Sequence, residues 1–191
     1  TEKKSRLLRA YIGGYPLWLA WQVTDRCNFR CGFCGYWKDP QGELPEQTLE
    51  DFDYGSRQLA RIGSMFVSLA GGEPLLREDL VEIARLIARW HLPFVTTNGY
   101  LMTADLAQEL YDAGLWGVSV SLDYARPETH DRRRGMKGAH ARAVEALGHQ
   151  ARAKRRPWQR LNLMAVLMND NLDELDELAK LAAEFKAYLM V

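Results

Sequence analysis

Short apolar runs with β-strand character alternate along the chain with longer segments whose apolar residues recur every three or four positions. The runs predict six strands, at residues 17–23, 65–70, 92–97, 116–122, 160–168 and 187–191. The segments between them predict five helices, four of them with clear apolar stripes at 49–62, 80–90, 106–113 and 172–182. Strand followed by helix at intervals of roughly thirty residues is typical of parallel βαβ units with right-handed crossovers. The pattern therefore predicts an α/β fold.

Local signals support these boundaries. Thr103 stands where a helix N-cap is favoured, and Gly114 stands just past the end of the same helix, where a left-handed residue is common. Two architectures fit the order of elements: an open doubly wound sheet, or an arc of a (β/α) barrel. A complete eight-unit barrel needs about 250 residues, more than the 191 present.

Composition narrows the class of protein. Apolar residues make up 47% of the chain, enough for one sizeable core, and 25 basic residues balance 25 acidic ones. A net charge of zero gives no reason to expect nucleic acid as a partner. The apolar stretch at 15–21 is too short to span a membrane, and no cleavable leader precedes it, so we expect a cytoplasmic protein.

The boundaries of the predicted domain follow from the strands. Residues 1–16 form an N-terminal lead-in segment, and 17–191 form the α/β domain. The last predicted strand ends at Val191 with no helix after it. An apolar strand left uncovered would promote aggregation. We therefore expect that a sixth helix, and any C-terminal domain, would lie beyond Val191.

The three cysteines lie together in the loop after the first predicted strand. Cys27, Cys31 and Cys34 occupy eight positions in a C-x3-C-x2-C pattern. Three cysteines cannot all pair with one another, and their clustering in one loop indicates metal chemistry in a reducing compartment. A closed zinc site needs four ligands. One of the four histidines could complete it, and this alternative stays open, although none has the usual short spacing.

Other unusual residues follow the remaining strands. "GGEP" at 71–74, "TNG" at 97–99, "SLD" at 121–123 and "MND" at 168–170 come directly after strands two to five or close them. Taken singly, each is a turn or a helix cap. Ligands of parallel α/β proteins bind at the carboxyl ends of the strands, so all five loops are expected to meet at one mouth.

These motifs together resemble the radical S-adenosylmethionine (SAM) superfamily. The cysteine spacing, Phe33 just before the last cysteine and "GGEP" after the second strand carry the resemblance, which extends from about residue 17 to the end. It implies a partial (β/α)6 barrel. It also implies that Cys27, Cys31 and Cys34 hold a 4Fe–4S cluster and that SAM binds the iron left without a protein ligand.

The resemblance further implies which residues contact SAM. Gly71 and Gly72 would let the backbone approach the ligand closely, and Glu73 would accept from its ammonium group. Ser121 and Asp123 would face the methionyl carboxylate or the ribose.

Phe33 would pack near the adenine, and two asparagines are further candidates for contact. The complete predicted set is Phe33, Gly71, Gly72, Glu73, Pro74, Asn98, Ser121, Asp123 and Asn169.

The implied activity is that of an enzyme. A small electron donor, such as a flavodoxin or ferredoxin, would reduce the cluster, and SAM cleavage would give a 5′-deoxyadenosyl radical that abstracts hydrogen from a substrate. The motifs resemble two branches: maturases of peptides or peptide-derived cofactors, often with auxiliary clusters in a C-terminal domain, and the GTP-cyclising enzyme of molybdenum-cofactor synthesis.

Three alternatives to a maturase stay open. "GYWKDP" at 35–40 departs from the Met-Pro expected of the GTP-cyclising enzyme. Radical SAM enzymes of lipid or sugar modification are a less specific relation. The non-enzymatic alternative is an iron–sulfur module for electron transfer or sensing, which should not need an open iron or "GGEP".

The remaining clusters have simpler explanations. "RRR" at 132–134 and "RAKRR" at 152–156 are expected to face solvent, because cations near a helix C-terminus complement its dipole. The six tryptophans share no spacing, so we expect them to pack in the core or at its rim.

Overall fold

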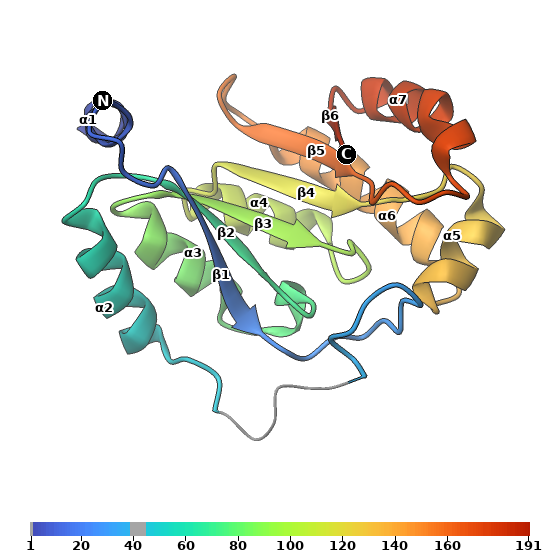
Figure 1. Ribbon diagram of the computed structural model, residues 1–191, viewed down its shortest axis with the longest axis horizontal. Helices are drawn as coiled ribbons and strands as arrows, with labels where there is room; N and C mark the ends of the chain where they lie inside the picture. Colours follow the sequence, from blue (N-terminus) through green and yellow to red (C-terminus); the bar gives the residue numbers. More distant parts are fainter. Residues whose placement is uncertain (1, 39–44) are drawn as a thin grey trace.

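The structure, a computed structural model, describes residues 2–38 and 45–191. One sheet of six parallel strands runs through it, and the strands follow each other in space in chain order (Figure 1). The strands are β1 Trp18–Thr24, β2 Phe66–Gly71, β3 Leu92–Thr97, β4 Gly117–Ser121, β5 Arg160–Met164 and β6 Tyr188–Met190. All six predicted strands are confirmed.

Helices connect each strand to the next. The helices are α1 Glu2–Ile12, α2 Leu49–Ala60, α3 Leu80–Ala88, α4 Ala104–Asp112, α5 Pro127–Arg134, α6 Ala139–Ala153 and α7 Leu175–Glu184, with short 3-10 turns η1 Pro74–Leu76 and η2 Leu172–Glu174. The Thr103 side chain accepts from the Leu106 backbone N–H at 3.1 Å, and Gly114 has a φ of 101°. Both predicted caps of α4 are confirmed.

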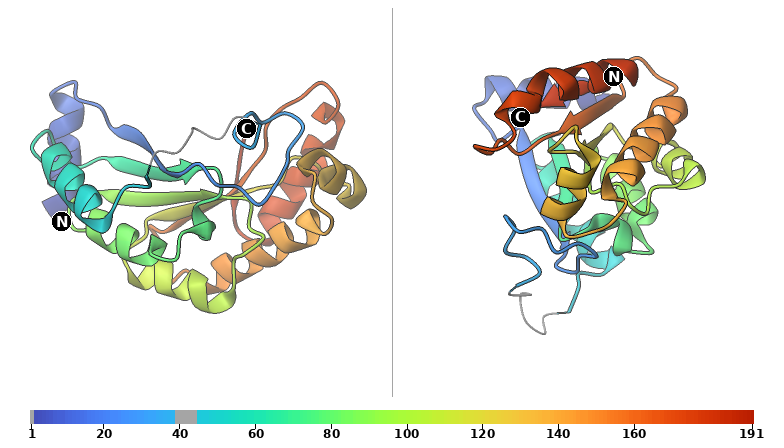
Figure 2. Two further views of the ribbon diagram at one scale, coloured as in Figure 1. Left: turned by 90° about the horizontal axis from the view of Figure 1, so that it is seen from below. Right: turned by 90° about the vertical axis from the view of Figure 1, so that its right-hand side faces the viewer.

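The order of the strands distinguishes the two architectures left open by the sequence. A doubly wound sheet reverses its strand order at a switch point, whereas this sheet never reverses. The helices that connect its strands therefore lie on one face, and the sheet curves around the other as an open crescent (Figure 2). β1 and β6 form its two edges. The fold is a partial (β/α)6 barrel.

The core lies between the sheet and these helices. Alternate strand residues such as Val67, Val118 and Leu161 are buried there among helix residues. The strand positions between them belong to the concave face, where the Asn162 amide donates to Ser119 Oγ at 3.1 Å. Toward the amino ends of the strands the same face carries aromatic rings, with the Trp18 ring centroid 6.0 Å from that of Phe66 and 5.9 Å from that of Phe94.

Several strand boundaries and two helices differ from the prediction, and the largest difference is in β5. β5 ends at Met164 and not at 168, because the Asn171 side chain bonds the Val166 carbonyl at 2.9 Å and the Met168 N–H at 2.8 Å, holding that segment outside the sheet. β6 is shorter by a residue at each end. α1 and α5 were not predicted. The sequence of α5, "PETHDRRR", has no apolar stripe to reveal it.

A membrane-spanning helix is not found in the part of the chain that the structure describes.

Candidate functional site

The cysteine loop leaves β1 at Thr24 and runs past the carboxyl ends of the strands toward α5 (Figure 1). Phe29 anchors it: this side chain is fully buried, and its ring meets the Tyr100 ring edge-on at 5.6 Å between centroids. The Gly32 N–H donates to the Arg133 carbonyl at 3.0 Å, at the end of α5. The loop is therefore held from two sides by the domain that follows it.

The three cysteine side chains belong to one small cluster. Cys31 is 6% exposed and forms the cluster core with Phe29 and Ala139, while Cys27 and Cys34 pack against that core. All three are free thiols. Burial raises the pKa of Cys27 and of Cys31 above the ordinary thiol value. Because a metal binds the thiolate, loading this site would release protons.

This donor set fits a cluster better than a single ion. Within residues 2–38 and 45–191, no three His, Cys, Asp or Glu side chains are placed to hold one metal ion. In an iron–sulfur cube each thiolate binds a different iron, so the three sulfurs need not converge on one point. Three free thiols in one loop are the donors that such a cube requires.

The turn "GGEP" is joined to the cysteine loop by its backbone. The Gly72 N–H donates to the Thr24 carbonyl at 2.9 Å, and the Glu73 N–H donates to the Arg26 carbonyl at 2.8 Å. A Cβ at Gly71 would overlap the Thr24 carbonyl oxygen, and one at Gly72 would overlap that of Arg26. The close approach that makes glycine necessary here is thus to the chain's own cysteine loop. A close approach of the same backbone to the ligand stays a prediction.

Glu73 is buried and fully engaged with backbone and side-chain donors. Its Oε1 accepts from the Leu75 N–H at 3.0 Å and from Thr97 Oγ1 at 2.7 Å, and its Oε2 accepts from the Asn98 N–H at 2.7 Å. Burial raises its pKa. The carboxylate therefore ties the loop after β2 to the loop after β3. Pro74 next to it is buried and begins η1.

Asn98 extends the same connection to the cysteine loop. Its amide nitrogen donates to the Asn28 side-chain oxygen at 2.8 Å, and its oxygen accepts from the Tyr100 N–H at 3.0 Å. Asn28 lies between Cys27 and Phe29, and the sequence reasoning did not single it out. The three loops after β1, β2 and β3 thus form one hydrogen-bonded unit, which places "GGEP" and "TNG" beside the cysteines.

Asp123 is held inside the domain by hydrogen bonds, and its expected contact with the ligand stays a prediction. It is fully buried, its Oδ2 accepts from Arg134 Nε at 2.7 Å, and its Oδ1 accepts from the Val166 N–H at 2.9 Å. Both carboxylate oxygens are therefore used inside the domain. Ser121, the last residue of β4, is buried as well.

Arg134 is a second residue near the cysteines that the sequence does not indicate. It is 8% exposed and lies over the Phe33 ring, with its guanidinium carbon 5.3 Å from the ring centroid. Burial raises the pKa of Cys31, and the positive charge of Arg134 acts in the opposite direction. The expectation that "RRR" faces solvent is wrong at this position. No sequence signal indicates it, because the pairing with Asp123 depends on α5.

Within the described residues, no contact links Asn169 to the cysteines. Its side chain is exposed, and within the described residues it has no hydrogen bond. Its neighbour Asp170 accepts from the Tyr124 hydroxyl at 2.8 Å and pairs with Arg133. Phe33 is 40% exposed, although Arg134 lies over its ring.

Comparisons with known proteins show what this chain is similar to. A family model described as the radical SAM superfamily matches residues 21–182. The AdoMet-dependent heme synthase of Methanosarcina barkeri is 35% identical over 173 residues, which cover 90% of this chain and 48% of that protein. The mycofactocin maturase MftC of Mycolicibacterium smegmatis is 33% identical over 180 residues, covering 92% and 44%.

A third relative belongs to the other branch that the motifs resemble. The GTP 3′,8-cyclase of a Picosynechococcus species is 40% identical over 134 residues, which cover 61% of this chain and 37% of that protein. Among solved structures, Streptococcus suis SuiB bound to its precursor peptide SuiA has the same fold, with a TM-score of 0.77, 20% identity and coverage of 96% and 40%. The chain spans less than half the length of each of these proteins.

Proposed function

The chain belongs to the radical SAM superfamily, whose members are enzymes that use a 4Fe–4S cluster and SAM, and we propose that Cys27, Cys31 and Cys34 hold that cluster here. The observation that carries the proposal is the gathering of three free thiols beside the "GGEP" turn. The sequence has no fourth cysteine, so one iron would keep an open position for SAM.

The surrounding residues would shape the SAM site in two ways. Gly71, Gly72 and Pro74 set the course of the turn, and Glu73 holds it against the next loop. Ser121, Asn98 and Phe33 would contact the ligand directly.

Asp123 would act through Arg134, whose buried guanidinium opposes the effect of burial on the pKa of Cys27 and Cys31 and suits a carboxylate of the ligand. Asn169 stays a prediction without a contact in the structure to support it.

When bound, the cluster and SAM supply a 5′-deoxyadenosyl radical that abstracts hydrogen from a substrate. The chain's own contribution is to hold three thiolates, to orient the ligand through fixed loops and to keep water away. Buried Phe29, Ala139 and Cys31 already exclude water from the inner side of the loop. The family assignment disfavours the alternatives of a zinc domain and of an electron-transfer or sensing module.

The proposed reaction belongs to the maturation of a peptide or of a cofactor. The maturase and heme-synthase relatives support it, and the GTP-cyclase relative supports cyclisation of GTP as the second candidate. Lipid or sugar modification is the third and least specific candidate. The electron donor would be a flavodoxin or ferredoxin. Free thiols suit a reducing compartment, which supports a cytoplasmic location.

Anaerobic reconstitution of single variants tests the proposal. We expect the parent chain to bind about four irons, and Cys27→Ala, Cys31→Ala and Cys34→Ala each to lose them. Gly32→Ala is the matched control, because a Cβ there meets no atom within 4 Å. With dithionite as reductant, the parent should convert SAM to 5′-deoxyadenosine. A cysteine variant that keeps its four irons would refute the assignment.

A further inference from the structure

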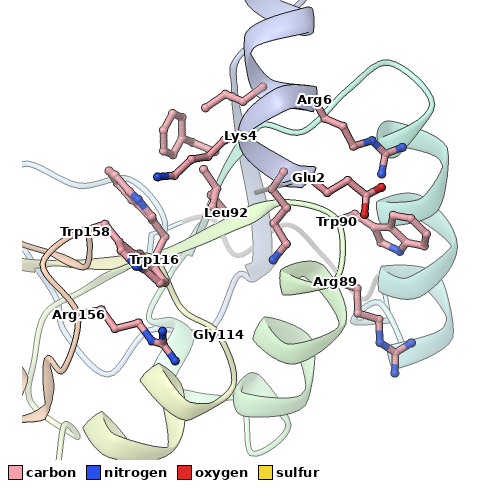
Figure 3. Close-up of a pocket in the computed structure, with 13 residues that line it drawn as sticks. Glu2, Lys4, Arg6, Arg89, Trp90, Leu92, Gly114, Trp116, Arg156 and Trp158 are labelled. Atoms are coloured by element: carbon pink, nitrogen blue, oxygen red, sulfur yellow. The ribbon is translucent and has the colours of Figure 1, made fainter.

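A cavity lies at the end of the sheet opposite the cysteines. Phe66 and Leu92, the first residues of β2 and β3, line it together with Trp116, which directly precedes β4. α1 covers it from outside (Figure 3). Its volume is about 690 Å³, within the range of about 300–1,000 Å³ typical of small-molecule sites.

The lining of this amino-end pocket is strongly cationic. Lys3, Lys4, Arg6, Arg89 and Arg156 line it, against Glu2 as its one lining carboxylate within the described residues. Two of the cations satisfy helix ends: Lys3 Nζ donates to the Ala88 carbonyl, and an Arg6 guanidinium nitrogen donates to the Ala60 carbonyl at 3.0 Å. These two therefore have a structural role in docking α1.

Lys4 and Arg156 have no such role. Neither side chain forms an ion pair within residues 2–38 and 45–191. The Arg156 guanidinium carbon lies 5.9 Å from the Trp158 ring centroid. Arg89 is exposed, and its contact with Asp53 is long, at 3.4 Å. Positive charge without matching carboxylates favours an anionic ligand.

Aromatic rings form two sides of the pocket. Figure 3 shows Trp116, Trp158 and Arg156 on one side and Trp90 with Arg89 on the other. Trp116 is held rigidly, with its ring 4.6 Å from that of Phe66. Trp158 is 42% exposed, against the expectation that the tryptophans pack in the core or at its rim. Exposed indole beside unpaired cations is suited to stacking a flat ring whose anionic group the cations bind.

We propose that the amino-end pocket binds a small planar aromatic anion with the chemistry of a nucleoside phosphate. Arg156 and Lys4 bind the phosphate, and Trp158 stacks on the base. A phosphate alone would leave the indole faces in water, and an uncharged base would leave both cations without an anionic partner. The site is separate from the SAM site, since it lies at the other end of the strands, and the proposal holds whatever reaction the cysteine end performs.

Calorimetric titration of this chain at low salt tests the proposal with three probes. AMP carries ring and phosphate, adenosine lacks the phosphate, and inorganic phosphate lacks the ring. We expect AMP to bind about tenfold more tightly than either part, because stacking and phosphate binding each contribute on the order of a factor of ten. Comparable binding of AMP and adenosine, or no heat with AMP, would overturn the proposal.

Substitutions in and beside the pocket test whether AMP binds there. Arg156→Gln and Trp158→Leu should each weaken AMP binding about tenfold. Arg155→Gln is the matched control, because Arg155 neighbours Arg156 but pairs with Asp112 and does not line the pocket; it should change affinity less than about twofold. AMP binding should persist in the Cys31→Ala variant and with saturating SAM. Competition by SAM would assign AMP to the SAM site and overturn the proposal.

Discussion

The two ends of the parallel sheet use polar side chains in opposite ways. At the carboxyl end, Glu73, Asp123 and Arg134 are buried, and each is fixed by charge-assisted hydrogen bonds of 2.7 Å. At the amino end, Lys4 and Arg156 are exposed and form no ion pair within the described residues. The comparison teaches that the carboxyl end is organised before any ligand arrives, whereas the amino end keeps charge available for one.

The buried pair of Asp123 and Arg134 gives the largest expected difference between the ends. Asp123→Ala leaves the Arg134 guanidinium buried without a carboxylate and should lower the free energy of unfolding by about 3–5 kcal/mol. Arg134→Met in the same chain should recover much of this loss. Urea denaturation measures both effects.

An exposed pair is the control for that experiment. Arg142 and Glu145 pair at 2.9 Å with both side chains more than half exposed. Glu145→Ala should cost less than about 1 kcal/mol, because water screens such pairs. Equal losses in Asp123→Ala and Glu145→Ala would show that the carboxyl end is not held by buried charge.

The contact between "GGEP" and the cysteine loop gives the next effect. A methyl group at Gly72 would overlap the Arg26 carbonyl, so Gly72→Ala should destabilise the domain by about 3 kcal/mol. Iron incorporation and SAM binding should fall together, because the same contact positions the cysteines. Gly32→Ala in the same loop should change stability by less than about 0.5 kcal/mol. SAM binding lost with iron retained would instead indicate a role toward the ligand alone.

His130 makes the stability of the carboxyl end depend on pH. Burial is the main cause that lowers its pKa from 6.5 to about 3. The positive charges of Arg134 and His140 act in the same direction, and the negative charge of Asp131 acts against them. The unfolded chain therefore takes up a proton first as the pH falls below 6.5. The free energy of unfolding should decrease toward pH 3 by up to about 1.4 kcal/mol per pH unit from this group. His130→Gln should flatten that slope in denaturation curves between pH 7 and 4. An unchanged slope would contradict the burial of His130 as a neutral side chain.

Substitutions at the amino end should have the smallest effect on the free energy of unfolding. Arg6→Gln removes a hydrogen bond to the Ala60 carbonyl at the end of α2 and should cost about 1 kcal/mol. Iron incorporation should stay unchanged, because the cysteines lie at the other end of the sheet. Arg9→Gln, at an exposed position of α1, is the control, and its thermal unfolding should match the parent. Loss of iron in Arg6→Gln would show that the two ends are coupled.

The sequence by itself determined the strands, most helices and the candidate cluster ligands. Apolar periodicity is a local property, and burial of the apolar face makes it visible in the sequence. Thr103 and Gly114 could be assigned for the same reason, because a cap acts within a few residues of itself. The grouping of Cys27, Cys31 and Cys34 was also readable, since one loop carries all three.

Only the tertiary structure decided which polar groups meet across the loops. Arg134 reaches Asp123 because α5, a helix without an apolar stripe, turns its last residue inward. Gly72 touches Arg26, although the two are 46 residues apart in the chain, because β1 and β2 pair and their ends lie side by side. The amino-end pocket likewise joins α1 to loops more than a hundred residues away. Such pairings depend on strand order and helix placement, and no local pattern in the sequence records them.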